Sequence, residues 1–230
     1  MAGPHPVGLT LFAGQFLLQF FGIAGGMPPG LASIVVQTQA LFTILFAALL
    51  LREWPTTRQT LGLALGLAGL TAIAVTVGRD LTLIGFALTL GSAISWAIGN
   101  LLLKRLPPTS TLELMVWLSL VPPLPALVLA LIVDGPHEIV HAVARITWPG
   151  LAAVLYLGAV ATVLAYANWG DLLRRYPAAA VTPFALLAPF VAAAGSAVAF
   201  GERFGPLRLA GMGLVLCGLG VIVLPRRAGA

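Results

Sequence analysis

Long hydrophobic stretches, separated by short polar or Pro- and Gly-containing breaks, follow one another along the whole chain. Each is close to the roughly 20 residues that an α-helix needs to cross the hydrocarbon core of a bilayer. The stretches are hydrophobic on every face, whereas transmembrane β-strands alternate hydrophobic and polar residues over about ten residues. This pattern predicts an all-α membrane protein, a polytopic helical bundle. Its eight transmembrane helices are expected at residues 7–25, 29–51, 59–77, 83–103, 112–133, 148–173, 178–200 and 207–224.

The composition agrees with a chain that lies in a lipid bilayer. Hydrophobic residues make up 60% of it and charged residues 8%, against about 25% charged residues in soluble domains. No basic segment with a cleavage site precedes the first predicted helix, so we expect that helix to stay in the protein. The net charge of +5 does not indicate a nucleic-acid partner, because the basic residues lie at helix ends and not in one patch.

The basic residues instead predict the orientation of the chain in the membrane. Eight of them fall on one side and four on the other, and the side richer in Lys and Arg is usually cytoplasmic. We therefore expect a multi-pass protein of the inner (plasma) membrane with a cytoplasmic C-terminus. The eight are Arg52, Arg58, Lys104, Arg105, Arg174, Arg175, Arg226 and Arg227.

The sequence also contains an internal repeat. When the chain is shifted against itself by 149 residues, Glu53 aligns with Glu202 and Gly62 aligns with Gly211. At this offset the first three predicted helices match the last three, with opposite orientations in the membrane. Inverted repeats of this kind are typical of secondary transporters. We predict an incomplete first repeat of three helices at residues 1–77 and a second repeat of five helices at residues 82–225.

Two helices of the second repeat, predicted at residues 83–103 and 112–133, have no counterpart in the first. The counterpart of Gly85 would be residue −64 (85 − 149). We therefore expect the chain to be a fragment or the product of a late start. The expected fold is a five-plus-five inverted-repeat transporter fold that lacks its first two helices.

Uncharged polar residues lie inside several of the predicted helices. Ser33 and Gln37, like Trp96 and Asn100, are four residues apart and so share a helix face. Such groups either hydrogen-bond neighbouring helices or converge on a cavity in the middle of the membrane, where inverted-repeat transporters bind substrate. Both interpretations stay open for any single residue. For the set we expect a substrate site formed by Gln19, Ser33, Gln37, Gln39, Trp96, Asn100, Tyr166 and Asn168.

The carboxylates lie near predicted helix ends or in connections, and none is at the bilayer centre. A charge there is costly and usually marks a proton relay or a cation site. The pattern therefore favours a neutral or zwitterionic solute. Glu53 and Glu202 are expected to cap a helix or to pair with the neighbouring Arg52 and Arg203.

No motif predicts an enzyme. The sequence has no Gly-rich phosphate loop, nucleophile elbow or Cys/His cluster, so we expect neither catalysis nor a cofactor. His137 and His141 are four residues apart in an expected loop, but no third ligand is near them. A metal site is therefore not expected.

Four longer segments carry a resemblance to a known family. They are GMPPGLASIVVQTQALFTILFAALLLRE, GFALTLGSAISWAIGNLLLKR, YLGAVATVLAYANWGDLLRRYPAAAVTPFALLAPFV and FGERFGPLRLAGMGLVLCGLGVIVL. These segments resemble EamA-type transporters of the drug/metabolite transporter superfamily, and most of all the O-acetylserine/cysteine exporter branch. The resemblance implies ten helices in two inverted five-helix repeats, and a central cavity that opens to alternate faces of the membrane.

Together these features predict a secondary transporter that exports small polar amino-acid metabolites, similar to O-acetylserine or cysteine, across the inner membrane by alternating access. The expected partners are a small-molecule solute and the lipid bilayer, and the oligomeric state is not predicted. Two alternatives stay open. One is export of a drug or a different metabolite, and the other is a membrane fragment that does not transport.

Overall fold

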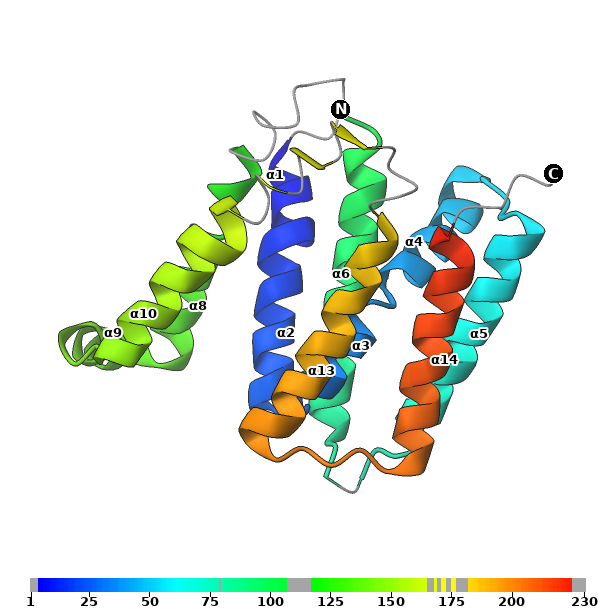
Figure 1. Cartoon of the computed structure of the whole chain (residues 1–230). Coiled ribbons are helices and arrows are strands. Elements are labelled where there is room, and N and C mark those ends of the chain that lie inside the picture. Colours follow the sequence, from blue (N-terminus) through cyan, green and yellow to red (C-terminus); the bar gives the residue numbers. More distant parts are fainter. Residues whose placement is uncertain are drawn as a thin grey trace. The chain divides into compact units, whose positions relative to one another are not determined.

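A computed structural model describes residues 4–78, 80–106, 117–164, 168, 171–172, 175–176 and 182–224. All regular elements within these residues are helical, as the prediction of an all-α protein requires (Figure 1). They are α1 (Pro4–Gly8), the π-helix η1 (Leu9–Gly14), α2 (Gln15–Ala24), α3 (Pro29–Val36), α4 (Gln39–Leu51), α5 (Thr57–Ala74), α6 (Leu83–Leu103), α8 (Pro123–Val133), α9 (Gly135–Ala144), α10 (Trp148–Leu155), the π-helix η2 (Tyr156–Leu164), the 3₁₀-helix η3 (Thr182–Leu186), α13 (Leu187–Phe200) and α14 (Pro206–Val223).

The chain divides into two compact units. The first unit contains α1 to α6, α13 and α14, and comprises residues 1–123 and 186–230. The second unit comprises residues 124–185 and contains α9, α10 and η2. All the contacts on which the functional argument depends lie within the first unit.

Four helical segments of the described chain are long and apolar enough to cross a membrane. They are His5–Ala24, Pro29–Leu51, Leu83–Leu103 and Pro206–Val223. A fifth span results if Trp117–Val133 and Gly135–Ala144, which meet at 112°, count as one. Three further predicted spans appear as the 18-residue α5 and as shorter apolar helices at Trp148–Ala161 and Phe184–Phe200. The described residues thus form an all-helical membrane protein with four or five candidate spans.

Local sequence signals explain where helices of the first unit begin and end. Thr56 and Gln59 form a capping box at the start of α5, in which each side chain bonds the backbone of the other. The Thr82 hydroxyl accepts a hydrogen bond from the Gly85 N–H and so caps α6. The turn after α2 needs a positive φ, which glycine supplies at Gly26, where φ is 101°.

The connection expected between the helices at 112–133 and 148–173 is itself helical, so the loop prediction for His137 and His141 was wrong. It forms α9, with Gly135 and Pro136 at its start and Glu138 in its first turn. Proline is favoured at helix starts, and an acidic residue there interacts well with the helix dipole. The two imidazole rings stack one helical turn apart, with centroids separated by 5.5 Å. Within the described residues no group of three or more His, Cys, Asp or Glu side chains is arranged to hold a metal ion.

Glycines bring α5 and α14 into close antiparallel contact along their length (Figure 1). A Cβ atom on Gly62 would lie 2.6 Å from the Gly218 carbonyl oxygen. One on Gly69 would lie 2.5 Å from the Gly211 carbonyl oxygen. Small residues at such positions let membrane helices approach backbone to backbone, where packing stabilises the pair.

Replacing Gly69 with alanine is expected to destabilise the protein by about 1 to 3 kcal/mol, because the added methyl group meets backbone atoms that cannot move aside locally. The measurement is thermal unfolding in detergent, followed by fluorescence-detected size exclusion. Gly213→Ala, on α14 where nothing lies within 4 Å of the added Cβ, is the matched control. Equal melting temperatures for the two variants would contradict the close packing at Gly69.

Arg208 joins the start of α14 to the end of α5. Its side chain is 5% exposed, and its guanidinium donates to the Thr76 hydroxyl at 2.9 Å and to both carboxylate oxygens of Asp80. A buried charge is tolerated when it is paired and hydrogen-bonded in this way. Arg208, one of the four basic residues on the side of the membrane with fewer Lys and Arg, is therefore also a structural residue.

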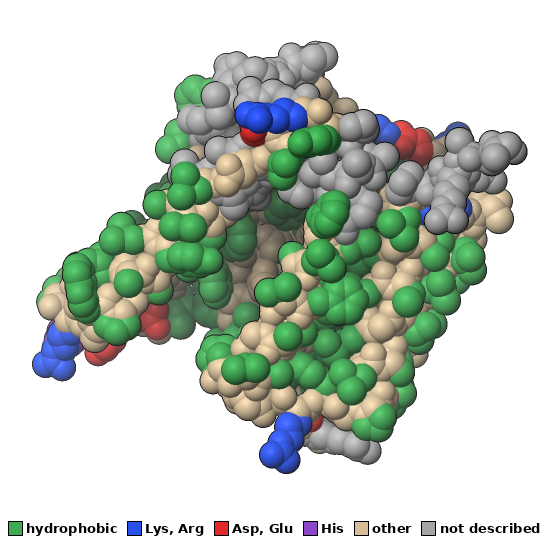
Figure 2. All heavy atoms as spheres, viewed as in Figure 1, with side chains coloured by type: hydrophobic (Ala, Val, Ile, Leu, Met, Phe, Trp, Pro, Cys, Tyr) green, Lys and Arg blue, Asp and Glu red, His purple; other side chains and the backbone are tan. Residues whose placement is uncertain are grey.

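The outer surface carries many hydrophobic side chains, as expected for a protein surrounded by lipid. Figure 2 shows hydrophobic and uncharged atoms over α13 and α14, with charged side chains near helix ends. Val198 and Phe200 on α13 are 88% and 71% exposed. Such exposure would be unusual on a soluble monomer.

Candidate functional site

The helix predicted at residues 29–51 is interrupted near its middle. Gln37 and Thr38 separate α3 from α4, and their N–H groups bond carbonyls three residues earlier, at 3.1 and 3.0 Å. The Thr38 side chain is fully buried, and its hydroxyl donates to the Val35 carbonyl at 2.6 Å. Such a tightened turn within a helix is often found at functional hinges. The polar residues of this stretch thus coincide with a local change in backbone hydrogen bonding.

A short chain of hydrogen bonds runs from this turn to the end of α6. The Thr43 hydroxyl donates to the Gln39 carbonyl at 2.7 Å, and the Asn100 amide donates to the Thr43 hydroxyl at 3.2 Å. The Gln39 side-chain oxygen is buried without a hydrogen-bond partner among the described residues. These bonds connect the Asn100 side chain to the backbone of Gln39 through Thr43, and they do not involve the Gln39 side chain.

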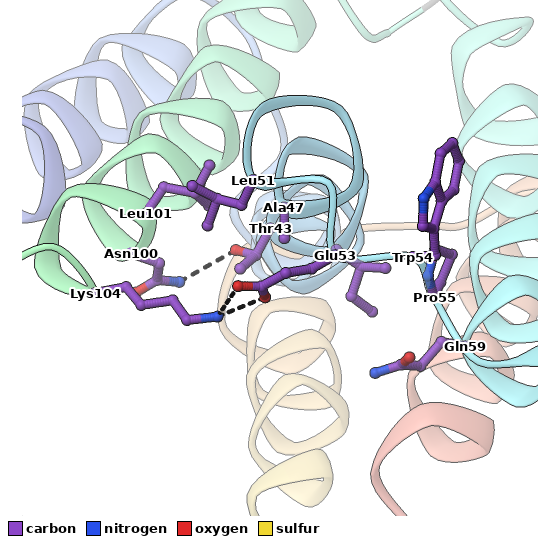
Figure 3. A pocket seen from close by; sticks show the side chains of 11 residues that line it. Thr43, Ala47, Leu51, Glu53, Trp54, Pro55, Gln59, Asn100, Leu101 and Lys104 are labelled. Carbon is purple, nitrogen blue, oxygen red and sulfur yellow. Dashed lines mark hydrogen bonds and ion pairs between the residues drawn. The ribbon is translucent and has the colours of Figure 1, made fainter.

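Asn100 and Thr43 line a cavity of about 290 Å³. The cavity lies where α4 and α6 end and α5 begins, and Figure 3 shows Asn100 and Lys104 together beside Thr43 and Glu53, with Gln59 on α5 across from them. Its wall consists of Thr43, Ile44, Ala47, Leu51, Glu53, Trp54, Pro55, Gln59, Asn100, Leu101 and Lys104. The cavity thus combines a mainly apolar wall with a few polar groups, as small-molecule sites commonly do.

Lys104 and Glu53 are the charged residues that line this cavity, and they form an ion pair. The two side chains are 57% and 48% exposed, so the pair contributes at most about 1 kcal/mol to stability. The expected pairing of Glu53 with Arg52 was wrong. Arg52 adopts a left-handed conformation (φ 57°) where α4 ends, and the following residue, Glu53, reaches the end of α6 instead.

The structure disperses several of the other predicted site residues. Gln19 accepts a hydrogen bond from the buried Gln15 at 2.9 Å on the same helix face. Trp96 meets the ring of Phe12 edge to face, with centroids 6.1 Å apart, and packs against an apolar cluster. Ser33 donates to the Gly30 carbonyl at 2.7 Å and lies 3.4 Å from the Pro189 carbonyl on α13. These three groups make helix contacts and are not among the residues that line the cavity.

The remaining predicted residues occupy different settings. Gln37 lies at the turn between α3 and α4 and is half-buried. Asn168 is exposed and belongs to the second unit. Tyr166 lies outside the described residues. The site assignment as a whole therefore stays a prediction, and Asn100 is the member of the predicted set that lines the cavity.

Sequence reasoning missed the charged members of the cavity. Lys104 is among the orientation signals and not among the predicted site residues, although it follows Asn100 by four residues and so shares its helix face. For Glu53 the sequence predicts only a structural role, and for Gln59 it predicts none. The spacing of Asn100 and Lys104 was the available signal.

Glu202 is a second carboxylate whose partner in the structure differs from the predicted one. Glu202 was expected to pair with Arg203, but its carboxylate accepts hydrogen bonds from the Gly30 N–H, at 3.1 and 3.3 Å. Glu202 therefore caps the start of α3 from the connection between α13 and α14. The alternative prediction, that Glu202 caps a helix, is therefore correct. Gly30, which it caps, is 172 residues away in the sequence.

Several known proteins are similar to this chain. A probable amino-acid metabolite efflux pump of Salmonella typhimurium (strain LT2) is 39% identical over 218 residues, covering 92% of this chain and 73% of that protein. A probable amino-acid metabolite efflux pump of Escherichia coli (strain K12) is 37% identical over 226 residues, covering 96% and 76%. A probable terminal-alkyne amino-acid exporter of Streptantibioticus cattleyicolor is 29% identical over 208 residues, covering 87% and 65%.

No solved structure matches the chain. Residues 6–75 and 83–224 match the EamA-like transporter family, and this match includes every helix around the cavity. The all-helical structure, its apolar spans and this match agree with the resemblance seen in the sequence. The chain is therefore a multi-pass membrane protein that belongs to the EamA-like transporter family.

Proposed function

We propose that this chain exports small polar amino-acid metabolites, of the O-acetylserine or cysteine kind, across the inner membrane. The observation that carries the proposal is the presence of Glu53, Lys104 and Asn100 in one small cavity. A zwitterion offers a carboxylate for Lys104 and an ammonium group for Glu53, and charge-assisted hydrogen bonds of this type are the stronger ones. The names of the relatives, two efflux pumps for amino-acid metabolites and an exporter of an amino acid, support the same solute class.

The size of the cavity also supports a small solute. Sites for drug-sized ligands usually measure about 300–1,000 Å³, and this cavity, at about 290 Å³, lies just below that range. A metabolite with one carboxylate and one ammonium group fits such a volume better than a large hydrophobic drug does.

The proposed mechanism is alternating access between two inverted repeats, residues 1–77 and 82–225, in an eight-span arrangement. Contacts between α5 and α14 support the inverted relation. The offset that aligns Gly62 with Gly211 also aligns Gly69 with Gly218, since 218 − 69 is 149. Replacing both partners of the Gly62–Gly218 contact by their repeat counterparts gives the pair Gly211 and Gly69. Both pairs are in contact. A pseudo-twofold axis between the two helices accounts for this pairing.

In the proposed orientation the C-terminus is cytoplasmic, because the connections richer in Lys and Arg face the cytoplasm. The ends of α4 and α6 then also face the cytoplasm. The cavity would receive solute from inside the cell, as an exporter requires.

A solute panel tests this function with the chain reconstituted in proteoliposomes. Vesicles preloaded with unlabelled O-acetylserine, cysteine, a sugar phosphate or ethidium are placed in radiolabelled O-acetylserine, and counterflow is measured. We expect counterflow with the first two solutes and none with the others or with protein-free vesicles. Equal counterflow with all four preloaded solutes would contradict the proposed solute class, and no counterflow even with O-acetylserine on both sides would contradict its transport by this chain.

A further inference from the structure

The start of α3 depends on a cap from elsewhere in the chain. Pro28 and Pro29 occupy its first positions and have no N–H group, and its first turn contains no acidic residue. Gly30 provides the first N–H, and this group donates to both carboxylate oxygens of Glu202. A carboxylate at this position satisfies an unpaired donor and interacts favourably with the helix dipole.

The fit around Gly30 leaves no space for a side chain. A Cβ atom there would lie 2.6 Å from Glu202 Oε2, 3.0 Å from Phe204 Cζ and 3.0 Å from Ser196 Cβ. Phe204 also packs against the main hydrophobic core. The end of α13 and the connection to α14 therefore close directly over the start of α3.

This closed contact and the cavity lie at opposite ends of one span. The span Pro29–Leu51 has 23 residues and is about 35 Å long at 1.5 Å per residue. Gly30 lies at its first turn, whereas the cavity surrounds its last turns. The turn at Gln37 and Thr38 divides the span. α3 contacts α13 and α14 as well as α2 and α6, whereas α4 contacts α5 and α6.

The counterpart of Glu202 at the repeat offset is Glu53. Glu202 caps α3 where the connection between α13 and α14 packs over the helix start, and Glu53 pairs with Lys104 beside the cavity described above. Two equivalent carboxylates thus have different partners at the two ends of the first unit.

We propose that Glu202 is a positioning residue for transport: its bond to Gly30 holds α3 against α13 and keeps the end opposite the cavity closed, and it must release once in each transport cycle. This role rests on the proposed alternating access. It adds a specific contact that sets which end of the bundle is open.

The test measures the accessibility of both ends without any solute, so it does not depend on which solute is exported. Two single-cysteine variants are made in a Cys217→Ser background. Ser33→Cys reports the accessibility of the closed end, and Thr43→Cys reports the accessibility of the cavity. Labelling by a water-soluble maleimide is followed in proteoliposomes, with and without Glu202→Ala. Glu202→Gln, which keeps an acceptor but loses the charge, is expected to lie between the parent and Glu202→Ala.

In Glu202→Ala we expect labelling at position 33 to rise about tenfold, because the lost cap and its charge no longer hold α3 against α13. Labelling at position 43 is expected to fall, because opening one end closes the other. Arg203→Ala, which removes an exposed neighbour with no part in the cap, should leave both rates unchanged. Simple loosening of the fold would raise both rates.

A parent-like rate at position 33, a rise at both positions, or a rise at position 33 without a fall at position 43 overturns the proposal. Failure of the solute panel with the expected labelling pattern would instead refute the proposed solute class and leave the contact intact as a conformational element.

Discussion

Replacing Lys104 with alanine is expected to lower metabolite efflux about 10- to 100-fold while leaving the protein folded. The reason is that a hydrogen bond to a charged group contributes about 1.5–3 kcal/mol, whereas the exposed ion pair with Glu53 contributes little to folding. Initial efflux rates from preloaded proteoliposomes, normalised to reconstituted protein, measure the effect. Arg105→Ala removes the same charge from the neighbouring exposed position and is the matched control, with efflux expected to stay near that of the parent.

The exchange Glu53→Lys with Lys104→Glu separates a role in solute binding from a role in holding the two helices together. It restores the ion pair but reverses the positions of the two charges in the cavity. Because a zwitterion bound in its parent orientation would then face like charges, we expect the double variant to remain as inactive as Lys104→Ala. Recovery of efflux in the double variant would show that the pair is structural and would remove it from the site.

Replacing Asn100 with leucine is expected to lower efflux about tenfold or more. Asn100 uses one amide N–H for the Thr43 hydroxyl, and its amide group has a further N–H and a carbonyl oxygen for a solute. Leucine is similar in volume but can form no hydrogen bond, so the substitution removes the polar contact and changes the packing of α6 little. The apparent affinity for solute should weaken together with the maximal rate.

Ser92→Ala is the control for Asn100→Leu. Ser92 lies on the same helix and is fully buried, and its hydroxyl bonds only to the Thr89 carbonyl of its own helix among the described residues. Efflux in Ser92→Ala is expected to stay near that of the parent, because Ser92 does not line the cavity and its hydroxyl bonds only its own helix among the described residues. Parent-like efflux in Asn100→Leu at normal expression would refute the assignment of Asn100 to the site.

Several helices were predictable with accurate bounds because their cause is local. The stretch predicted at 83–103 is α6, Leu83–Leu103, and the stretch predicted at 29–51 is the span Pro29–Leu51. In lipid, each backbone polar group must be satisfied within its own segment, so a long apolar run becomes a helix whatever its neighbours are. The same argument does not predict the turn at Gln37 and Thr38, which departs from the regular helical bonding.

The candidate site was predictable only in part. Ser33, Gln39, Trp96 and Asn100 look alike in a sequence, as polar or amphipathic residues within apolar helices. In the structure Asn100 reaches a cavity, Trp96 meets an aromatic ring, and Ser33 faces backbone carbonyls. The difference depends on the rotation of each helix about its axis and on the partner it packs against, which periodicity does not specify.

The amino-acid sequence thus suffices for the membrane location, the helical class, most helix bounds and the family, because hydropathy, capping and shared segments can be evaluated along the chain. The partners of Glu53 and Glu202 required the folded protein. Each glutamate has an arginine beside it in the sequence, yet one pairs with Lys104 and the other caps Gly30. Such contacts depend on how distant helices are brought together, and a carboxylate binds the donor that the packed helices place within reach.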